Sequence, residues 1–348
     1  MGRLYPRRDD HASPARDSLV RERLFRTLRR QRQRQLRNCK RDCPALFFVA
    51  GIHYDARMDI FAAKIPGRPL LSFEFFPPKT PIGEVRFWEA LTLLARFRPD
   101  FISVTYGAGG GDRANTGRLV CAVQERLNLT AMPHLTCIGE ERTNLESLLD
   151  HYEQQDITHI MALRGDRPPG SPPEALARGA FDSAAALTAF IRKRHPRLRI
   201  GVACYPEVHP EAASREADLA YYRRKIEAGA DFAITQFFYD NTAYTRFVDD
   251  THAHGVTAPV IPGIMPVTDF KQIQRFSALC GAELPEWLVT QFEKVKEDPV
   301  ATLEIGVAVA VAQCRDLLDR GAPGLHFFTL NRAEAVGRIL DALHLAPA

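Results

Sequence analysis

The sequence predicts an α/β protein, a (β/α)8 barrel with extra helices that follows a basic N-terminal extension. From residue 66 onward, short β-branched or aromatic runs alternate with longer segments of helical periodicity. Polar residues recur near the ends of these runs at intervals of about 30 residues, the length of one βα repeat. Residues 66–348 also suit a closed barrel, which typically takes about 250 residues.

The eight expected strands are short and rich in Phe, Ile, Val and Thr, and they cover residues 70–76, 101–107, 131–138, 159–165, 200–206, 232–239, 259–265 and 325–331. Helical periodicity fills most of the intervals, and several of these segments open with Asn, Ser or Asp, which favour helix N-termini. The expected helices cover residues 83–97, 115–128, 183–195, 211–228, 241–254 and 269–280, and a longer helical insertion covers 285–320. This order favours one barrel with an insertion before its last strand.

An open, doubly wound sheet is the competing α/β architecture. Residues 109–114 follow an expected strand and fit the dinucleotide fingerprint G-x-G-x-x-A. That fingerprint needs an acidic residue at the end of the next strand, which here ends in Thr136 and Cys137. We therefore interpret the glycines as a tight loop whose backbone N–H groups can approach a ligand.

The N-terminal extension, residues 1–57, differs from the rest of the chain in charge. Residues 1–41 hold 13 Arg and one Lys against four acidic residues, a local charge of +10, so the remaining residues sum to −6 within the net +4. We expect this segment to be disordered, and Met58 is a candidate for the true start of a catalytic domain over 58–348. Nucleic-acid contact through the arginines and organelle targeting stay open as alternatives.

The composition is that of an ordinary globular protein, with 45% hydrophobic and 25% charged residues. No apolar run has membrane length and the start has no apolar export core, so we expect a cytoplasmic protein without membrane contact. Seven scattered cysteines without a C-x-x-C spacing predict reduced thiols and no metal site.

One polar constellation is expected at the barrel mouth, because functional residues of such barrels lie at the C-terminal ends of the strands. Its members, read from successive strand ends, are Glu74, Thr105, His134, Asp166, Tyr205 with His209, Gln236, Met265 and Asn331.

Glu74 is the strongest catalytic candidate. It stands among three phenylalanines in the run Ser72–Pro78, and an apolar setting would favour a neutral acid suited to proton donation. The alternative is a strand glutamate that faces solvent while the phenylalanines pack.

The other candidates also have structural alternatives. Asp166, flanked by Arg164 and Arg167, could form only a local salt bridge, and His134 could be a core histidine. Gln236 lies among aromatic residues, where an amide suits the edge of a flat heterocycle. The sequence lacks the motifs of serine hydrolases, P-loop enzymes and zincins, and its two tryptophans stand away from the strand ends, which disfavours glycoside hydrolysis.

Eight ordered blocks resemble the signature segments of bacterial-type methylenetetrahydrofolate reductase. They are SFEFFPPK (72–79), SVTYG (103–107), PHLTC (133–137), ALRGD (162–166), YPEVHP (205–210), ITQFF (234–238), IPGIMP (261–266) and FTLNR (328–332). The resemblance covers about residues 66–345. It implies a barrel flavoprotein that uses FAD and NADH or NADPH to reduce 5,10-methylenetetrahydrofolate to 5-methyltetrahydrofolate, in a ping-pong cycle that feeds methionine synthesis.

The resemblance also implies roles for individual residues. Glu74 would protonate N10 of the folate and open the imidazolidine ring to a 5-iminium cation, and Asp166 would stabilise that cation near the flavin. FAD contacts would come from Thr105, His134, Arg164, Gly165, Asp166, Ala203, Tyr205, His209, Asp218 and Lys225. The substrates would contact Glu74, Asp166, Gln236, Gln272, Phe276 and Arg332.

Two positions depart from the family pattern. Tyr221 stands where Asn or His is common, and Phe328 where Tyr is common, which removes a possible hydroxyl contact. The resemblance further implies a homo-oligomer, and because the chain ends at Ala348 we expect no regulation by S-adenosylmethionine.

Some alternatives stay open. Another barrel flavoprotein of the proline-dehydrogenase type would need an Arg pair to clamp a substrate carboxylate. A nucleic-acid-binding protein led by residues 1–41 is the alternative outside enzymes, although the acidic body makes nucleic acid an unexpected partner. No residue that reads a ribose can be assigned, so NADH and NADPH are not distinguished.

Overall fold

The computed structural model describes residues 61, 67–106, 113–166 and 179–345. The basic extension, Met58, the glycines at 109–111 and Arg167 lie outside these residues, so the predictions that concern them stay predictions. By contacts along the chain, Tyr54–Ala348 forms one compact unit, and the described residues belong to it.

The described residues contain nine strands, all paired in parallel in one sheet. They are β1 (Leu70–Phe75), β2 (Phe101–Val104), β3 (Ala131–Thr136), β4 (His159–Leu163), β5 (Arg199–Cys204), β6 (Phe232–Thr235), β7 (Val260–Ile261), β8 (Gly263–Ile264) and β9 (Gly324–Phe328). Each of the eight expected strands is confirmed, with the seventh divided into β7 and β8.

Pro262 divides the seventh strand into two halves, which pair with different neighbouring strands. The strand order is β7-β6-β5-β4-β3-β2-β1-β9-β8, so the two halves of one strand stand at the two edges of the sheet. β7 pairs with β6, and β8 pairs with β9. Pro262 has no N–H to donate, but its carbonyl oxygen accepts from the His326 N–H at 3.0 Å. The result is a barrel with eight strand positions, as the sequence predicts.

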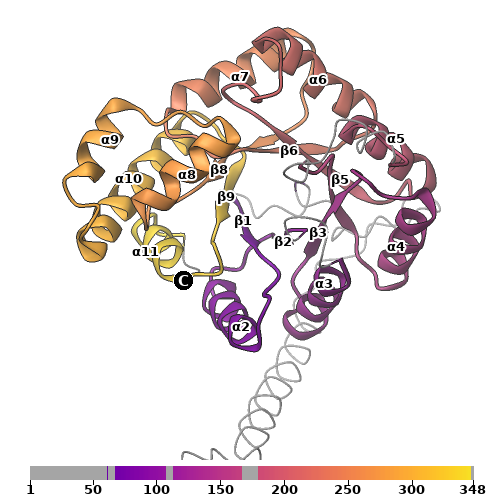
Figure 1. The fold of residues 1–348 in the computed structure, drawn as a ribbon, viewed down its shortest axis with the longest axis horizontal. Coiled ribbons are helices and arrows are strands. Elements are labelled where there is room, and N and C mark those ends of the chain that lie inside the picture. Colours follow the sequence, from indigo (N-terminus) through magenta and orange to yellow (C-terminus); the bar gives the residue numbers. More distant parts are fainter. Residues whose placement is uncertain (1–60, 62–66, 107–112, 167–178, 346–348) are drawn as a thin grey trace, which may run out of the picture. The chain divides into compact units, whose positions relative to one another are not determined.

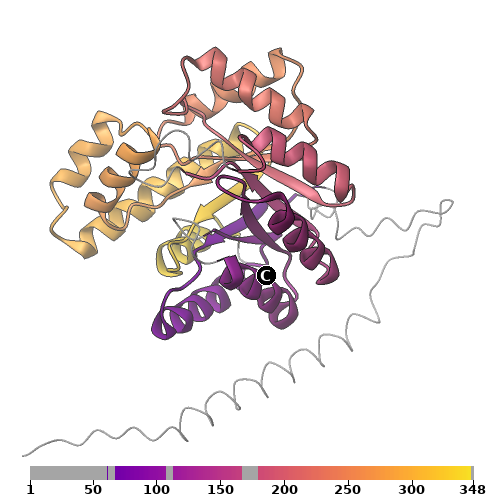
Figure 2. The same cartoon turned by 45° about the vertical axis from the view of Figure 1, so that its right-hand side comes forward.

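Ten helices surround the strands within the described residues, as Figure 1 shows. They are α2 (Pro81–Ala95), α3 (Arg113–Leu127), α4 (Arg142–Gln154), α5 (Ala184–Arg194), α6 (Arg215–Glu227), α7 (Asn241–Ala253), α8 (Phe270–Cys280), α9 (Glu286–Glu293), α10 (Pro299–Asp319) and α11 (Glu334–Ala342). In both Figure 1 and Figure 2, α8 and α9 lie on the opposite side of the barrel from α4. The predicted insertion at 285–320 is helical and forms α9 and α10.

Local capping explains where several helices begin. Ser183, Ser214, Asp240 and Asp269 each accept a hydrogen bond from a backbone N–H of the first turn of their helix. The predicted start of the helix expected over residues 211–228 is wrong, because Ser214 caps α6, which begins at Arg215. The preceding residues form a loop in which the Ala212 N–H donates to the His209 carbonyl oxygen.

The strands separate two apolar regions. Alternate residues such as Leu71, Phe73 and Phe75 face the helices in the main core. The opposite face fills the barrel interior with a second cluster, made of Leu70, Phe101, Met132, Met161, Phe232, Ile234 and Ile261. These residues stand early or midway in their strands, so they form an apolar plug in the barrel interior below the carboxyl ends of the strands. The carboxyl ends are therefore available for polar groups.

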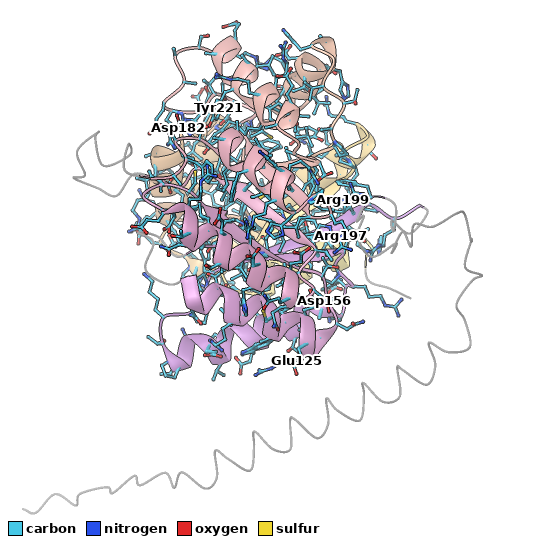
Figure 3. The ribbon with its side chains drawn as sticks, turned by 90° about the vertical axis from the view of Figure 1, so that its right-hand side faces the viewer. Glu125, Asp156, Asp182, Arg197, Arg199 and Tyr221 are labelled. Carbon is cyan, nitrogen blue, oxygen red and sulfur yellow. The ribbon has the colours of Figure 1, made fainter. Side chains whose placement is uncertain are left out.

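Figure 3 views the barrel from the side of α3 to α6. Arg197, just before β5, and Arg199, its first residue, lie on one side of this face. Asp182, which precedes α5, lies on the other side together with Tyr221 of α6. The second side therefore corresponds to the carboxyl ends of the strands, where the candidate site is built.

Candidate active site

Glu74 lies inside the barrel, on the same face of β1 as Leu70 and Ser72, and its residue is only 8% exposed. Its Oε2 atom lies 3.3 Å from Nε2 of His134 on β3 and 3.7 Å from Nε2 of His326 on β9. This burial rules out the alternative of a solvent-facing strand glutamate. A carboxyl group 3.3 Å from an imidazole nitrogen can exchange a proton with it, whereas the second imidazole lies just beyond hydrogen-bond distance.

The expected reason for the burial of Glu74 is wrong in one respect. Phe73 and Phe75 belong to the core between strands and helices, on the opposite face of β1, and Phe76 is exposed. The alternation of a strand sends neighbouring residues to opposite faces, so the adjacent phenylalanines do not surround the carboxyl group. Glu74 is instead buried by its position inside the barrel, beside two histidines.

His134 is buried beside the Glu74 carboxyl group rather than among apolar side chains alone. It is 7% exposed, and burial lowers its pKa while the Glu74 carboxylate opposes that shift. A neutral imidazole is therefore favoured beside Glu74.

His326 is a member of this cluster that the sequence analysis did not single out. It is fully buried, and its Nδ1 lies 2.8 Å from Oγ of Ser72, its register partner on β1. Its ring also stacks on Phe101 at 6.0 Å, at the top of the apolar plug. The signal that could have found it is a histidine in an otherwise apolar strand at the inward-facing positions.

Two residues after β9 hold the backbone of β1 at Glu74. The Thr329 hydroxyl donates to the Glu74 carbonyl oxygen at 2.6 Å. The Asn331 amide continues this pairing beyond the strands, since its Oδ1 accepts from the Phe76 N–H at 2.8 Å and its Nδ2 donates to the Phe76 carbonyl oxygen at 2.9 Å. Asn331, read from the sequence as a strand-end candidate, therefore braces the site, and Arg332 beside it is exposed.

Hydroxyl groups of β2 and its end contribute polar atoms that have no partner among the described residues. Oγ of Ser103 and Oγ1 of Thr105 are buried and unpaired. The Thr105 backbone is fixed, because its carbonyl oxygen accepts from the Thr116 hydroxyl at 2.9 Å. Buried hydroxyls without partners are uncommon in proteins and suit a bound polar group.

The turn after β4 presents Arg164, Gly165 and Asp166. Gly165 has φ of +89°, and a Cβ there would lie 2.7 Å from Cγ2 of Ile138, so glycine is required. Arg164 pairs with Glu211 at 2.6 Å, and this hydrogen bond raises the pKa of the guanidinium. Asp166 is exposed, and Arg164 does not form the local salt bridge with it that was considered as an alternative.

The loop after β5 holds Tyr205 and His209 together. Their rings pack edge to face with centroids 4.5 Å apart. The His209 N–H donates to Oδ2 of Asp218 at 3.0 Å, and Nδ1 of His209 accepts from the Glu211 N–H. Nδ1 is thus an acceptor, which places the ring proton of the neutral imidazole on Nε2.

Lys225 places a buried ammonium group below this loop. It is 6% exposed, and its Nζ donates to the Ala203 carbonyl oxygen at 2.7 Å. Burial lowers its pKa to about 8, and nearby Asp218 opposes that shift. The same Nζ lies 4.8 Å from the centre of the Tyr221 ring. A buried cation with few polar partners is costly for the fold and suits an anionic ligand.

The remaining predicted residues come from β6 and α8. Gln236 follows β6, and its Oε1 accepts from the adjacent Phe237 N–H at 3.0 Å. Gln272 and Phe276 lie four residues apart on α8, and Phe276 packs against the cluster that supports this helix. Met265 is buried in the same cluster.

A family model described as methylenetetrahydrofolate reductase matches residues 60–344 of the chain. The chain belongs to the methylenetetrahydrofolate reductase family. Relatives named 5,10-methylenetetrahydrofolate reductase include one from Pectobacterium carotovorum, 41% identical over 82% of this chain and 93% of the relative. Another, from Escherichia coli K12, is 39% identical over 82% of this chain and 94% of the relative.

A solved structure shares the fold of this reductase family member. It is an uncharacterized protein from Clostridium thermocellum that binds two copies of 5-methyl-5,6,7,8-tetrahydrofolic acid. It aligns with a TM-score of 0.55 at 11% identity and covers 80% of this chain and 96% of its own. At this identity the likeness concerns the fold alone.

The two departures from the reductase pattern lie beside the site. The ring of Tyr221 faces two cations, Lys225 at 4.8 Å and Arg224 at 5.3 Å. Phe328 contacts His326 edge to face, with ring centroids 5.3 Å apart. Tyr221 thus supplies an aromatic face to the cations, and Phe328 supports the histidine through apolar contact rather than a hydroxyl.

The described residues hold no group of three or more His, Cys, Asp or Glu arranged to bind a metal ion. Their five cysteines are free thiols. No helix among them is both long enough and apolar enough to cross a membrane.

Proposed function

We propose that this protein reduces 5,10-methylenetetrahydrofolate to 5-methyltetrahydrofolate, with FAD as cofactor and NADH or NADPH as reductant. The observation that carries the proposal is Glu74, a carboxyl group buried between two imidazoles near the carboxyl ends of the barrel strands, in a member of the reductase family. Family membership also favours this activity over a barrel flavoprotein that oxidises amino acids.

The residues around the site fit FAD. The unpaired hydroxyl of Thr105 and Nε2 of His209 suit its polar groups, and the buried ammonium of Lys225 suits a region of negative charge. Gly165 lets the backbone approach closely. The proposed FAD contacts are Thr105, His134, Arg164, Gly165, Asp166, Ala203, Tyr205, His209, Asp218 and Lys225. When bound, FAD supplies hydride transfer from the nicotinamide to the folate.

Glu74 would act as the general acid for the folate. In its neutral form it can donate a proton to N10 and so assist opening of the five-membered ring. His134 and His326 flank the carboxyl group, and the apolar cluster in the barrel interior lies beneath it. Glu74 then becomes a carboxylate 3.3 Å from Nε2 of His134, a ring nitrogen that can donate an N–H to it.

The other proposed substrate residues bind and orient. The exposed carboxylate of Asp166 would stabilise positive charge that develops on the folate. Gln236 would exchange its bond with the Phe237 N–H for bonds to a ligand, and Gln272, Phe276 and Arg332 would complete the pocket. If Gln236 and Phe276 serve both substrates, NAD(P)H must leave before folate enters, which is a ping-pong order.

Absorbance spectroscopy of the purified protein tests the proposal. We expect flavin bands that bleach on anaerobic addition of NADH and return on addition of methylenetetrahydrofolate. A protein that cannot be loaded with FAD, or whose reduced flavin does not respond to the folate, would refute the proposed reaction. Parallel titration with NADPH determines the preferred reductant.

The variant Glu74→Gln tests the general acid. We expect FAD binding and reduction by NADH to persist, while reoxidation by methylenetetrahydrofolate slows by about 100-fold or more, the usual contribution of general acid catalysis. Glu89→Gln, on the exposed face of α2, is the matched control and should leave both half-reactions unchanged. Retained folate reduction in the Glu74 variant would remove this assignment.

The proposed role in the cell follows from the reaction. We place the activity in one-carbon metabolism in the cytoplasm, where 5-methyltetrahydrofolate supports methionine synthesis, and expect a homo-oligomer. Measurement of the molecular mass in solution tests the oligomeric state. Growth without added methionine of a reductase-deficient strain that expresses this protein tests the role in methionine synthesis.

A further inference from the structure

Helix α8 carries Gln272 and Phe276, two residues of the proposed substrate pocket, and its C-terminal end meets the loop after β5. That loop, residues 205–211, carries Tyr205 and His209 of the proposed cofactor site. The contacts between the loop and the end of α8 therefore connect the two parts of the site.

A hydrogen bond from the Glu207 side chain joins these segments. Oε2 of Glu207 accepts from the Glu283 backbone N–H at 3.0 Å, across 76 residues of sequence. Glu283 stands in the short connection between α8 and α9. The bond therefore attaches the end of α8 through main chain, so the Glu283 side chain is free to vary.

Close packing at Gly281 provides a second contact. Gly281 ends α8 with φ of +74°, and a Cβ there would lie 2.8 Å from Cγ of Pro210 and 3.7 Å from the Val208 carbonyl oxygen. Only glycine combines this backbone conformation with so close an approach. The end of α8 thus lies directly on the loop.

The loop itself is anchored on the barrel helices. Nη1 of Arg215 on α6 lies 3.4 Å from the Pro206 carbonyl oxygen and 3.5 Å from that of Glu207. The same guanidinium pairs with Asp250 of α7 at 2.7 Å. Because the loop is fixed, its bond to the Glu283 N–H acts on α8.

We propose that Glu207 is a positioning residue. Its hydrogen bond with the Glu283 N–H, called the clasp below, holds the C-terminal end of α8 on the loop after β5 and so sets the placement of Gln272 and Phe276. This inference rests on the proposed function for the role of α8. The clasp itself is a property of the fold and has its own readout.

The charges around Glu207 give the clasp a pH dependence. Burial raises its pKa to about 7, and the carboxylates of Glu283 and Asp240 add to that shift, while the Glu283 N–H opposes it. The half-buried thiol of Cys280 at the end of α8, His209 on the same loop and the guanidinium of Arg215 are the other titratable groups nearby.

The sign of the dependence follows from linkage. A released Glu207 in water regains the ordinary pKa of 4.5, whereas the clasped residue has a pKa of about 7. The clasped state therefore binds its proton more tightly, so acid favours the clasp and a rise in pH from about 4.5 to about 7 loosens it.

Hydrogen–deuterium exchange of residues 270–284 in the full-length protein tests the clasp without any ligand. After correction for intrinsic rates, wild-type protection should fall by about tenfold or more between about pH 5 and about pH 8, as linkage to the raised pKa of Glu207 requires. Glu207→Gln, a neutral acceptor of the same shape, should stay protected at both pH values. Glu207→Ala should be unprotected at both.

Glu283→Gln is the matched control, because it keeps the donating N–H and removes a neighbouring negative charge. It should retain the clasp and lose less protection as the pH rises. Equal protection of wild type and Glu207→Ala, or an unchanged pH response in Glu207→Gln, would overturn the proposal.

Kinetics then separate the clasp from the proposed reaction. Glu207→Ala should raise KM for both methylenetetrahydrofolate and NADH by about three- to tenfold, with kcat and FAD affinity unchanged, and Glu207→Gln should restore KM. If the wild type shows no folate turnover while exchange responds as expected, the proposed function fails and the clasp stands. If turnover is normal and neither exchange nor KM responds, the clasp fails alone.

Discussion

The contacts of Ser72, His326 and Glu74 show how single atoms prepare a buried acid. The Ser72 hydroxyl lies 3.4 Å from the Leu325 carbonyl oxygen, to which it can donate, and 2.8 Å from Nδ1 of His326. A hydroxyl that donates to the carbonyl oxygen can accept a hydrogen bond from the Nδ1–H group, which leaves Nε2 of His326 unprotonated on the side of Glu74. His326 thus turns an unprotonated ring nitrogen, rather than an N–H group, toward the Glu74 carboxyl group.

Replacement of His326 tests this residue-scale interpretation. We expect His326→Phe to slow reoxidation of the reduced protein by methylenetetrahydrofolate by about 10- to 100-fold, because the variant removes the imidazole beside Glu74 and leaves the Ser72 hydroxyl without that partner. Reduction by NADH should change by less than about twofold, because hydride transfer from the nicotinamide does not require the proton that Glu74 donates. Stopped-flow absorbance of each half-reaction measures both rates.

Ser72→Ala is the companion variant and should show a smaller loss in the same half-reaction. Equal losses in both half-reactions would instead indicate general distortion of the barrel mouth.

At the scale of elements, the packing of α10 against the segment before α8 depends on a helical glycine. A Cβ on Gly306 would lie 1.9 Å from the Val267 carbonyl oxygen, which no backbone could tolerate without movement. Gly337 on α11 is also helical, but its nearest neighbours would lie 3.8 and 4.0 Å from an added Cβ. The two positions gain the same helix propensity from an alanine, but only Gly337 has room for the added methyl group.

This contrast predicts opposite effects of the same substitution. Gly306→Ala should lower the free energy of unfolding by about 2 kcal/mol or more, because overpacking outweighs the gain in helix propensity. Gly337→Ala should raise it by up to about 1 kcal/mol. Urea titration followed by circular dichroism gives both values, and destabilisation of equal size at both positions would contradict the packing argument.

At the scale of the whole molecule, the barrel is the unit that carries the proposed site. The family match covers residues 60–344, and the compact unit covers Tyr54–Ala348. The described candidate residues all lie within both ranges. The nucleic-acid hypothesis concerns residues 1–41, which lie outside the described residues, so it stays a hypothesis.

A chain that starts at Met58 tests whether this unit is sufficient. We expect it to fold, bind FAD and turn over folate within about twofold of the full chain, since ligand contacts reside at the barrel mouth. Steady-state kinetics and thermal melting with and without FAD compare the two chains. Loss of folding in the shorter chain would show that part of the extension belongs to the domain, and mass spectrometry of the native protein identifies the true start.

The sequence by itself determined the strand–helix order and the barrel, and it predicted most residues of the candidate site. Strand periodicity and the recurrence of polar residues in every βα unit are local signals. They suffice to predict the elements and the end of the barrel at which the polar residues gather, because all strands of a parallel barrel end at the same mouth. The signature blocks identified the family, which the family model confirms.

Only the tertiary structure decided which side chains meet. The partners of Glu74 come from β3 and β9, and Ser72 reaches His326 across 254 residues of sequence, a pairing set by strand register. The phenylalanines beside Glu74 in sequence face the other side of the sheet. The clasp between Glu207 and Glu283 likewise depends on how two loops lie on the folded barrel. A periodic sequence predicts the elements, but contacts between distant residues follow from register and closure, which no local pattern records.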